Sequence, residues 1–236
     1  MKRLTLWLLP MLLASCSQGP QGDSYFPLTV GSNWTYLVTA DIDGHVSESK
    51  QWDRIDRVID TDKGTVVVRR SEASKGLGLE YWIKTEPGFI KRIAQRSDAD
   101  DQAKLDPNPI TVLKLPIAKN DTWLVPSQPF VIAAKTNLGG EDMKMPKVML
   151  NTTVEANDEV VTVPAGTFKD CVRIEGSGSM ELYVDSVSGF KSLPIVHREW
   201  FCKGVGLVKV ERIEELSSMF FSGGKITMEL LDYKIR

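Results

Sequence analysis

The sequence predicts an all-β fold: a curved antiparallel sheet or open half-barrel built from two similar halves, with little helix beyond the N-terminal segment. Three observations support this. Short runs rich in β-branched and aromatic residues recur from residue 25 to the C-terminus, turn-forming residues separate them, and runs in the first half resemble runs in the second. No segment keeps a 3.6-residue apolar period with capping residues, so helix should be scarce.

The expected strands are short, and turn-forming residues separate them. They are Trp34–Thr39, Thr65–Arg69, Tyr81–Lys84, Phe89–Ile93, Thr152–Glu155, Glu159–Val163, Cys171–Glu175, Glu181–Val184, Arg198–Lys203, Gly206–Ile213 and Lys225–Tyr233. The turns between the early strands contain Asp43-Gly44, Asp62-Lys63-Gly64 and Glu86-Pro87-Gly88, which are typical turn formers.

Three pairs of segments make the two halves similar. The matched segments are Val30–Leu37 with Ala118–Leu124, Gly64–Arg70 with Gly166–Arg173, and the hairpin Glu80–Lys91 with Glu199–Lys209. Their separations drift from about 89 to 119 residues, which excludes a fixed-period solenoid. A duplicated β unit is the economical explanation, and chance similarity between β-hairpins is the alternative. Duplication would make four tryptophans equivalent anchors in the concavity or core: Trp34, Trp82, Trp123 and Trp200.

Residues 1–15 predict an export signal. Lys2 and Arg3 give a charged start, and Leu4–Leu13 is an apolar run that only Thr5 and Pro10 interrupt. As a helix this run would span roughly 15 Å, about half of the hydrocarbon core of a membrane. It is therefore too short for a stable membrane span and suits a secretory signal. No other stretch reaches eighteen uninterrupted apolar residues, so we expect no second membrane segment.

The next residues resemble the lipobox of bacterial lipoprotein precursors, which here reads Leu13-Ala14-Ser15-Cys16. The resemblance implies cleavage before Cys16, transfer of a diacylglycerol to its thiol and acylation of its new amino group. An ordinary signal peptide with a chance cysteine is the alternative. Because Ser17 and not Asp follows Cys16, the resemblance to Gram-negative sorting rules implies the outer membrane if the host is Gram-negative, where we expect the periplasmic face.

The chain is thus expected to have three parts. A lipoprotein signal peptide spans residues 1–15, the lipidated cysteine and a flexible tether span 16–24, and a β domain spans 25–236. The tether would reach at most about 26 Å. The polar segment Ser97–Asn108 predicts a loop between halves 25–108 and 109–236, and Gly139–Pro146 predicts a second loop.

The charge balance restricts the partners. Without Lys2 and Arg3 the chain has 27 basic and 31 acidic residues, a net charge of −4 in place of −2. The charges are interspersed, whereas a nucleic-acid-binding protein would need a basic stripe. We therefore expect no nucleic-acid partner, and a membrane contact only through the lipid anchor.

Cys171 and Cys202 remain once Cys16 is lipidated. In an oxidising cell envelope an even pair favours a disulfide. Two buried thiols or a metal pair are the alternatives, but two cysteines with no second pair or histidine motif make a poor zinc site.

A second resemblance rests on Val163–Phe168 (VPAGTF) followed by Cys171, on Gly204–Lys209 (GVGLVK), and on Phe26-Pro27-Leu28, Gly31 and Trp34. These residues are similar to those of a widespread group of uncharacterised bacterial envelope lipoproteins, over roughly residues 25–213. The resemblance implies a mainly antiparallel β fold in the envelope and no known activity. The residues themselves predict turns, with positive φ at Gly204 and Gly206.

Few residues suggest chemistry. His45 follows a predicted turn and His197 begins a strand, and neither has a nucleophile-elbow or HExxH partner in the sequence. Asp98, Asp100 and Asp101 suggest calcium, but Ala103 and Pro109 occupy positions where the EF-hand pattern needs Gly and an acid.

Two further patterns fall short of a binding site. Met143, Met145 and Met149 could hold Cu(I), but Pro146 interrupts them and no histidine joins them. Gly76-Leu77-Gly78 lacks the third glycine of a dinucleotide-binding loop. We expect no catalytic residue, no metal and no cofactor.

The sequence therefore favours a membrane-anchored, non-enzymatic lipoprotein with a role in envelope structure, protein interaction or the binding of an apolar ligand. One alternative is a lipid or lipoprotein carrier with an apolar concavity, similar to half-barrel localisation chaperones. The other is an envelope hydrolase with a polar cluster near His197.

Overall fold

The computed structural model describes residues 24–62, 64–74, 76, 78–130, 147–187, 189–216 and 223–236. These residues form twelve strands and no helix, which confirms the all-β prediction. The strands are β1 (Asn33–Ile42), β2 (His45–Thr61), β3 (Gly64–Ala73), β4 (Leu79–Glu86), β5 (Phe89–Ser97), β6 (Lys104–Lys114), β7 (Thr122–Ser127), β8 (Val148–Val163), β9 (Gly166–Asp185), β10 (Gly189–Cys202), β11 (Gly206–Glu215) and β12 (Gly223–Lys234).

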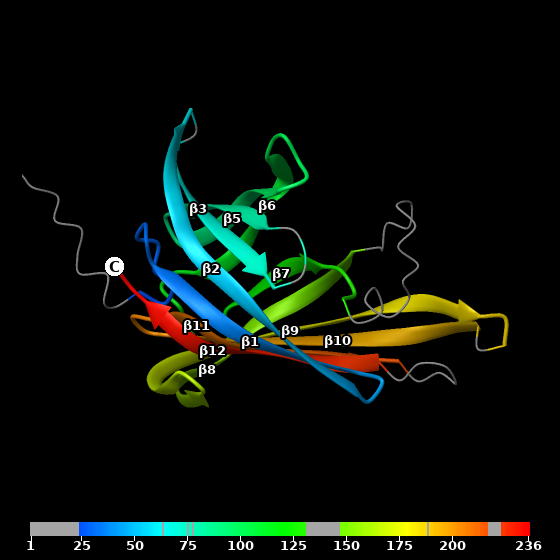
Figure 1. The fold of residues 1–236 in the computed structure, drawn as a ribbon. Coiled ribbons are helices and arrows are strands. Elements are labelled where there is room, and N and C mark those ends of the chain that lie inside the picture. Colours follow the sequence, from blue (N-terminus) through cyan, green and yellow to red (C-terminus); the bar gives the residue numbers. More distant parts are fainter. Residues whose placement is uncertain are drawn as a thin grey trace, which may run out of the picture.

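All twelve strands belong to one antiparallel sheet with the order β6-β5-β4-β3-β2-β1-β12-β11-β10-β9-β8-β7. It consists of two six-stranded meanders, β1–β6 and β7–β12, which the β1–β12 ladder joins. The sheet curls until its edge strands β6 and β7 come into contact without pairing (Figure 1). We call this place the seam, and the sheet is a nearly closed barrel with the seam as its only unpaired junction among the described strands.

The sequence similarities fall on strands that are six positions apart. They link β1 with β7, β3 with β9, and the hairpin β4–β5 with the hairpin β10–β11. The constant offset means that each strand occupies the same place in its own meander as its counterpart does. This regularity supports duplication of a six-stranded unit over chance similarity.

The expected boundary between halves lies inside a strand. Residues 108 and 109 belong to β6, which begins at Lys104 within the segment expected to be a loop. The sequence suggested a loop because the segment is acidic and polar, and Pro107 and Pro109 cannot donate ladder hydrogen bonds in a strand. A strand tolerates them here because β6 is an edge strand. The meanders are joined by residues 115–121, between β6 and β7.

The predicted turns have the backbone that their residues favour. Asp43 and Gly44 both have positive φ, at 58° and 77°, in the β1–β2 turn. Gly204 and Gly206 have φ of 75° and 93°, which confirms the positive φ expected for both. Gly206 lies against the Pro27 ring, so a side chain there would also meet a neighbour.

The chain segment before β1 closes one end of the barrel, which we call the base. Phe26 is buried against Phe201, with ring centroids 6.1 Å apart, and Leu28 packs against two core clusters. Ser24, the first described residue, accepts a hydrogen bond from the Gly204 amide in the β10–β11 turn. The C-terminus lies near the start of β1, and the hairpin β9–β10 extends to the opposite end of the molecule (Figure 1).

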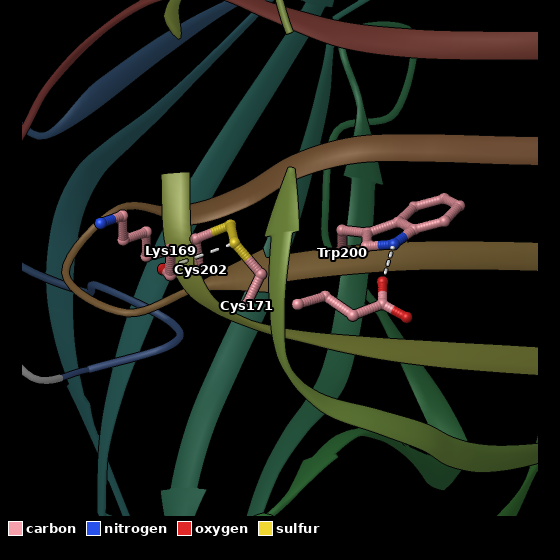
Figure 2. Close-up of a disulfide and its surroundings, with 5 residues drawn as sticks. Lys169, Cys171, Trp200 and Cys202 are labelled. Carbon is pink, nitrogen blue, oxygen red and sulfur yellow. Dashed lines mark hydrogen bonds between the residues drawn. A yellow bond between two sulfur atoms is a disulfide. The ribbon is translucent and has the colours of Figure 1, made fainter. Parts of the chain in front are cut away.

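The four tryptophans are not equivalent, contrary to expectation. Trp34 is 3% exposed in the core, and Trp123 faces the interior. Trp82 and Trp200 lie on the outer face, because Tyr81, Ile83, Glu199 and Phe201 line the interior and strand neighbours point to opposite faces. The Trp200 indole N–H donates to the Glu159 carboxylate at 2.8 Å (Figure 2). Sequence similarity placed the tryptophans on matching strands but did not show to which face of the sheet each side chain points.

Cys171 and Cys202 form the predicted disulfide (Figure 2). They are directly opposite each other on β9 and β10, and both are fully buried in a cluster with Val161 and Val163. The β8–β9 turn also folds back onto β12, where the Ala165 amide donates to the Leu230 carbonyl. The disulfide thus fixes two central strands of the second meander near the base.

Candidate functional site

The inner face of the barrel lines a cavity of about 580 Å³ that is partly open to solvent, which we call the main cavity. Alternate residues of eight strands and of the segments beside them point into it. Its apolar lining comes from Phe26, Ala73, Leu79, Ile83, Val112, Phe130, Phe201, Leu207 and Met228, and its polar lining from Gln51, Asp53, Arg69, Ser71, Tyr81, Arg92 and Glu199. Its volume lies within the range of cavities that hold drug-sized ligands.

The base beneath this cavity is closed by hydrogen bonds from two aromatic side chains. The Trp34 indole N–H donates to the Val205 carbonyl at 2.8 Å, and the Tyr36 hydroxyl donates to the Leu207 carbonyl at 3.0 Å. Burial raises the pKa of Tyr36 above its ordinary value, so the hydroxyl keeps its proton at physiological pH. These bonds join β1 to the β10–β11 turn and the start of β11, across the segment that contains Phe26.

The charged groups near the base of the main cavity are paired with one another. The Arg69 guanidinium lies 2.5 Å from the Asp53 carboxylate, which also accepts from Gln51 at 3.1 Å. Arg69 further lies over the rings of Phe26 and Trp34, at 5.5 and 5.6 Å from their centroids. Burial is the largest single effect and lowers the pKa of Arg69, but attraction to Asp53, Tyr36 and Tyr81 and the hydrogen bond to Asp53 together outweigh it and raise that pKa. Arg69 therefore needs no anionic ligand.

Arg92, on the first meander, is also satisfied within the protein. Its guanidinium donates to both oxygens of Asp106 at 3.0 and 3.3 Å and lies 5.7 Å from the centroid of the Tyr81 ring. The main cavity is therefore mixed in character, with apolar walls and internally neutralised ion pairs. The carrier hypothesis expected an apolar concavity, and these pairs are a departure from that expectation.

A second cavity, of about 170 Å³, lies at the seam. We call it the seam cavity. Its lining comes from Ile110, Thr111, Val112, Trp123, Val125, Leu150, Thr152, Ile174, Gly176, His197 and Glu199. Val112 and Glu199 line both cavities, so the two are neighbours with these side chains between them.

Two residues that line the seam cavity carry buried polar atoms without a partner. The Trp123 indole nitrogen and the His197 Nδ1 are both buried and have no hydrogen-bond partner. Most buried polar atoms in native proteins are paired, so these two nitrogens and the Trp82 nitrogen on the outer face are exceptions within the described residues. The His197 Nε2 lies 3.4 Å from a Glu199 carboxylate oxygen.

His197 was the residue on which the hydrolase hypothesis depended. A carboxylate does lie beside its imidazole, as that hypothesis required, and Thr152 lines the same cavity. Within the described residues, however, no serine, threonine or cysteine is hydrogen-bonded to His197. The arrangement has a base and a carboxylate but no activated nucleophile.

The other suggested chemical groups do not converge. His45 is exposed in β2, and Met149 is half exposed in β8, whereas Met143 and Met145 lie outside the described residues. Asp98 pairs with Arg70, and Asp100 lies 2.5 Å from the Lys104 ammonium. In the part of the chain that the structure describes, no group of His, Cys, Asp and Glu residues could hold a metal ion.

Asp98 belongs to an ion cluster on the outer face of β2–β5. Glu80 is its centre and accepts two hydrogen bonds from Arg96 at 2.7 and 3.0 Å, and two from Arg57 at 3.0 and 3.1 Å. The hydrogen bonds from Arg96 lower the pKa of Glu80 to about 2, against the effect of burial and with further help from Arg57. Every charge in this cluster has a partner, so its role is structural.

Cys16, to which the sequence assigns the lipid, lies outside the described residues, as does the signal segment. No helix of the described chain could cross a membrane. The sequence did not identify the main cavity, Arg69 or the unpaired Trp123 nitrogen. One signal of a polar interior was present in the sequence. Charged residues interrupt otherwise apolar strands, as Arg69 does after Val66-Val67-Val68.

Comparison with known proteins gives a family model described as DUF3108-like, which matches residues 113–219, somewhat less than half of the chain. Among solved structures, the chain is similar to a presumed lipoprotein from Parabacteroides distasonis ATCC 8503, at 14% identity and a TM-score of 0.47. It is also similar to a presumed exported protein with a YmcC-like fold from Bacteroides fragilis NCTC 9343, at 15% identity and a TM-score of 0.46. Each alignment covers 90% of this chain and 99% of the other. No curated protein matches the chain.

Proposed function

We propose that this protein is a lipid-anchored binding protein of the bacterial cell envelope, which holds a small molecule with a substantial apolar part inside its barrel and catalyses no reaction. The observation that carries the proposal is the main cavity of about 580 Å³. A protein used only as a scaffold or docking module would be expected to fill its interior with side chains. Here an apolar wall surrounds unfilled space.

The position of the chain start supports anchoring at the base. Ser24 is hydrogen-bonded to the β10–β11 turn and is the eighth residue after Cys16. A tether of this length would hold the closed base within about 26 Å of the membrane. Two or three acyl chains on Cys16 would make the attachment effectively permanent. On this account the outer membrane, with the domain on its periplasmic face, is the proposed location.

The cavity lining supports an amphipathic ligand over a purely apolar one. Phe201, Leu207 and Met228 supply apolar contact, whereas Glu199 and Tyr81 bring polar atoms to the same space. A small number of placed polar groups in an apolar site is the usual way in which such sites fix the orientation of a ligand.

Native mass spectrometry tests the proposal directly. The exported chain from residue 16, with Cys16→Ser so that no acyl chain is attached, should carry a non-covalent ligand that survives purification. Ser71→Phe places a ring in the main cavity and should abolish the bound mass. Glu48→Phe, on the exposed part of β2, is the matched control and should retain it. If the parental chain and both variants show only the mass of the polypeptide, the ligand-binding function is wrong.

A further inference from the structure

The main cavity has a closed end and an open end. Phe26, Phe201 and Leu207 line its closed end and are buried beside the base. Two other residues of its lining, Ala73 and Phe130, are exposed. They come from different meanders, since Ala73 is the last residue of β3 and Phe130 follows β7. These two residues therefore mark the place where the cavity meets solvent, which we call the mouth.

The register of β2 and β3 gives the cavity the same direction. Asp53, which pairs with Arg69 near the base, stands opposite Ser71, and Gln51 stands opposite Ala73. Residues two apart on a strand point to the same face of the sheet. Arg69, Ser71 and Ala73 all line the cavity, so this row of side chains leads from the charged pair near the base to the mouth.

The chain segment that carries Phe130 is held in place by an ion pair on β11. The Phe130 amide donates to both carboxylate oxygens of Glu214, at 2.8 and 3.0 Å. Arg212 donates to the Ser127 hydroxyl at 2.9 Å and to the Gln128 carbonyl at 2.8 Å. Arg212 and Glu214 are themselves 2.6 Å apart, and the Glu214 side chain is fully buried. Hydrogen bonds to charged groups are the strong ones, so they fix the position from which the Phe130 side chain projects.

This arrangement is unfavourable for the free protein in two respects. Burial of the Arg212–Glu214 pair removes two charges from water, which is costly. The Phe130 side chain stays 58% exposed and gains little from burial, although its backbone is firmly held. A ligand that covers the ring would supply the apolar contact that the folded chain leaves unmade.

We propose that Phe130 is a ligand-binding residue at the mouth of the main cavity, and that Arg212 and Glu214 are positioning residues that hold it there. The inference rests on the proposed function, because it assigns a contact to the ligand of the same cavity. One part of the ligand fills the space beside Phe201 and Leu207, and the part that emerges at the mouth packs against Phe130. The site therefore selects molecules that are still apolar where they leave the cavity.

Fluorescence titration with N-phenyl-1-naphthylamine tests the mouth contact on the Cys16→Ser chain. This uncharged probe has two linked aromatic groups, and its emission rises when it leaves water. Phe130→Ala should raise the Kd of the probe about five- to tenfold, because apolar contact is lost. Phe130→Leu should restore most of the affinity. Phe190→Ala is the matched control: Phe190 is 70% exposed on the β9–β10 hairpin, and this variant should bind like the parent.

A double-mutant cycle tests the positioning role. Arg212→Met/Glu214→Leu removes both charges, so neither is left buried alone, and should raise the Kd about as much as Phe130→Ala does. Added to Phe130→Ala, it should change nothing further, because it acts only through Phe130. Should this variant not fold, Ser127→Ala removes one Arg212 contact instead. It should raise the Kd about two- to threefold, and this effect should also vanish in the Phe130→Ala background.

The outcomes separate this inference from the function on which it rests. A Phe130→Ala variant that binds the probe as Phe190→Ala does would overturn the mouth contact. The ligand-binding function would then stand if Ser71→Phe still abolishes probe binding. Additive losses in the cycle would overturn the positioning role. If the parental chain binds no probe, the mouth contact fails, and if it also carries no co-purified ligand, the proposed function fails with it.

Discussion

At the scale of single residues, this barrel separates two kinds of polar group. Most of those on the outer face and at the base are paired with neighbours, as Glu80 is with two arginines and Asp53 is with Arg69, although the Trp82 nitrogen is not. Those at the seam are not, although they are equally hidden from solvent. The paired groups stabilise the fold, whereas the buried nitrogens of Trp82, Trp123 and His197 have no such compensating partner.

Glu80 offers the clearest prediction for stability. Its pKa is about 2 in the folded protein, below its ordinary value of about 4.5, so its ion pairs stabilise the fold fully above pH 4.5. This contribution is lost as the pH falls from about 4.5 to 2. One pKa unit corresponds to about 1.4 kcal/mol, so the Glu80 carboxylate accounts for on the order of 3 kcal/mol.

Glu80→Gln should therefore lower the free energy of unfolding at pH 7 by about 2–3 kcal/mol and flatten its decline below pH 4.5. Urea denaturation at a series of pH values measures both effects. Glu72→Gln is the control: the Glu72 side chain is 38% exposed against 4% for Glu80, and its loss should cost less than about 1 kcal/mol. Equal losses in the two variants would refute this account of the cluster.

At the scale of elements, the hairpin between β11 and β12 depends on one backbone position. Gly223 has a φ of 91°, and a Cβ atom there would lie 2.1 Å from the Glu214 carbonyl oxygen. Gly44 in the β1–β2 turn also has a positive φ, of 77°, but a Cβ atom there would meet nothing within 4 Å. The two glycines therefore separate steric clash from backbone strain.

Gly223→Ala should destabilise the protein by more than about 2 kcal/mol, because clash adds to strain. Gly44→Ala should cost only about 1–2 kcal/mol, the strain of a left-handed alanine. Thermal unfolding followed by circular dichroism would rank them. A Gly44→Ala variant as unstable as Gly223→Ala would show that contact with the Glu214 carbonyl is not what requires glycine.

The disulfide between β9 and β10 makes a prediction for the second meander. It closes a loop with a sequence separation of 31 residues, which the chain-entropy model values at roughly 3–4 kcal/mol. The double variant Cys171→Ala/Cys202→Ala should lose about that much in guanidinium denaturation. Cys16→Ser in the same background should change nothing. If the midpoint of the double variant matches that of the parent, the disulfide does not stabilise the fold.

The sequence predicted where the strands lie better than it predicted which of their residues face the barrel interior. Strand runs, glycine turns, the disulfide and the similarity of the halves could be predicted because each is written in local composition and spacing. The inward or outward direction of Trp82 and Trp200 could not, since strand ends and bulges set it. The seam cavity was also beyond reach, because Trp123 and His197 lie far apart in the sequence and meet only when the sheet curls.

At the scale of the whole molecule, Ser24, the first described residue, lies at the closed base, where it accepts a hydrogen bond from the Gly204 amide. Lipidation of Cys16 should therefore place this end toward the membrane. Cys16→Ala should move the protein from the membrane fraction to the soluble envelope fraction, without changing its unfolding midpoint. Cell fractionation with immunoblotting measures the shift. A Cys16→Ala protein that still sediments fully with membranes would contradict the lipid anchor.

The central claim is that the barrel interior holds an amphipathic ligand, and a crystal structure grown with 8-bromo-1-octanol tests it most directly. Anomalous scattering from bromine would locate the apolar end of the probe, and electron density would locate its hydroxyl. The account predicts bromine in the main cavity near Phe201, Leu207 and Met228, with the hydroxyl toward Tyr81 and Glu199. Bromine found only on the outer face, with unbroken solvent in both cavities, would contradict it.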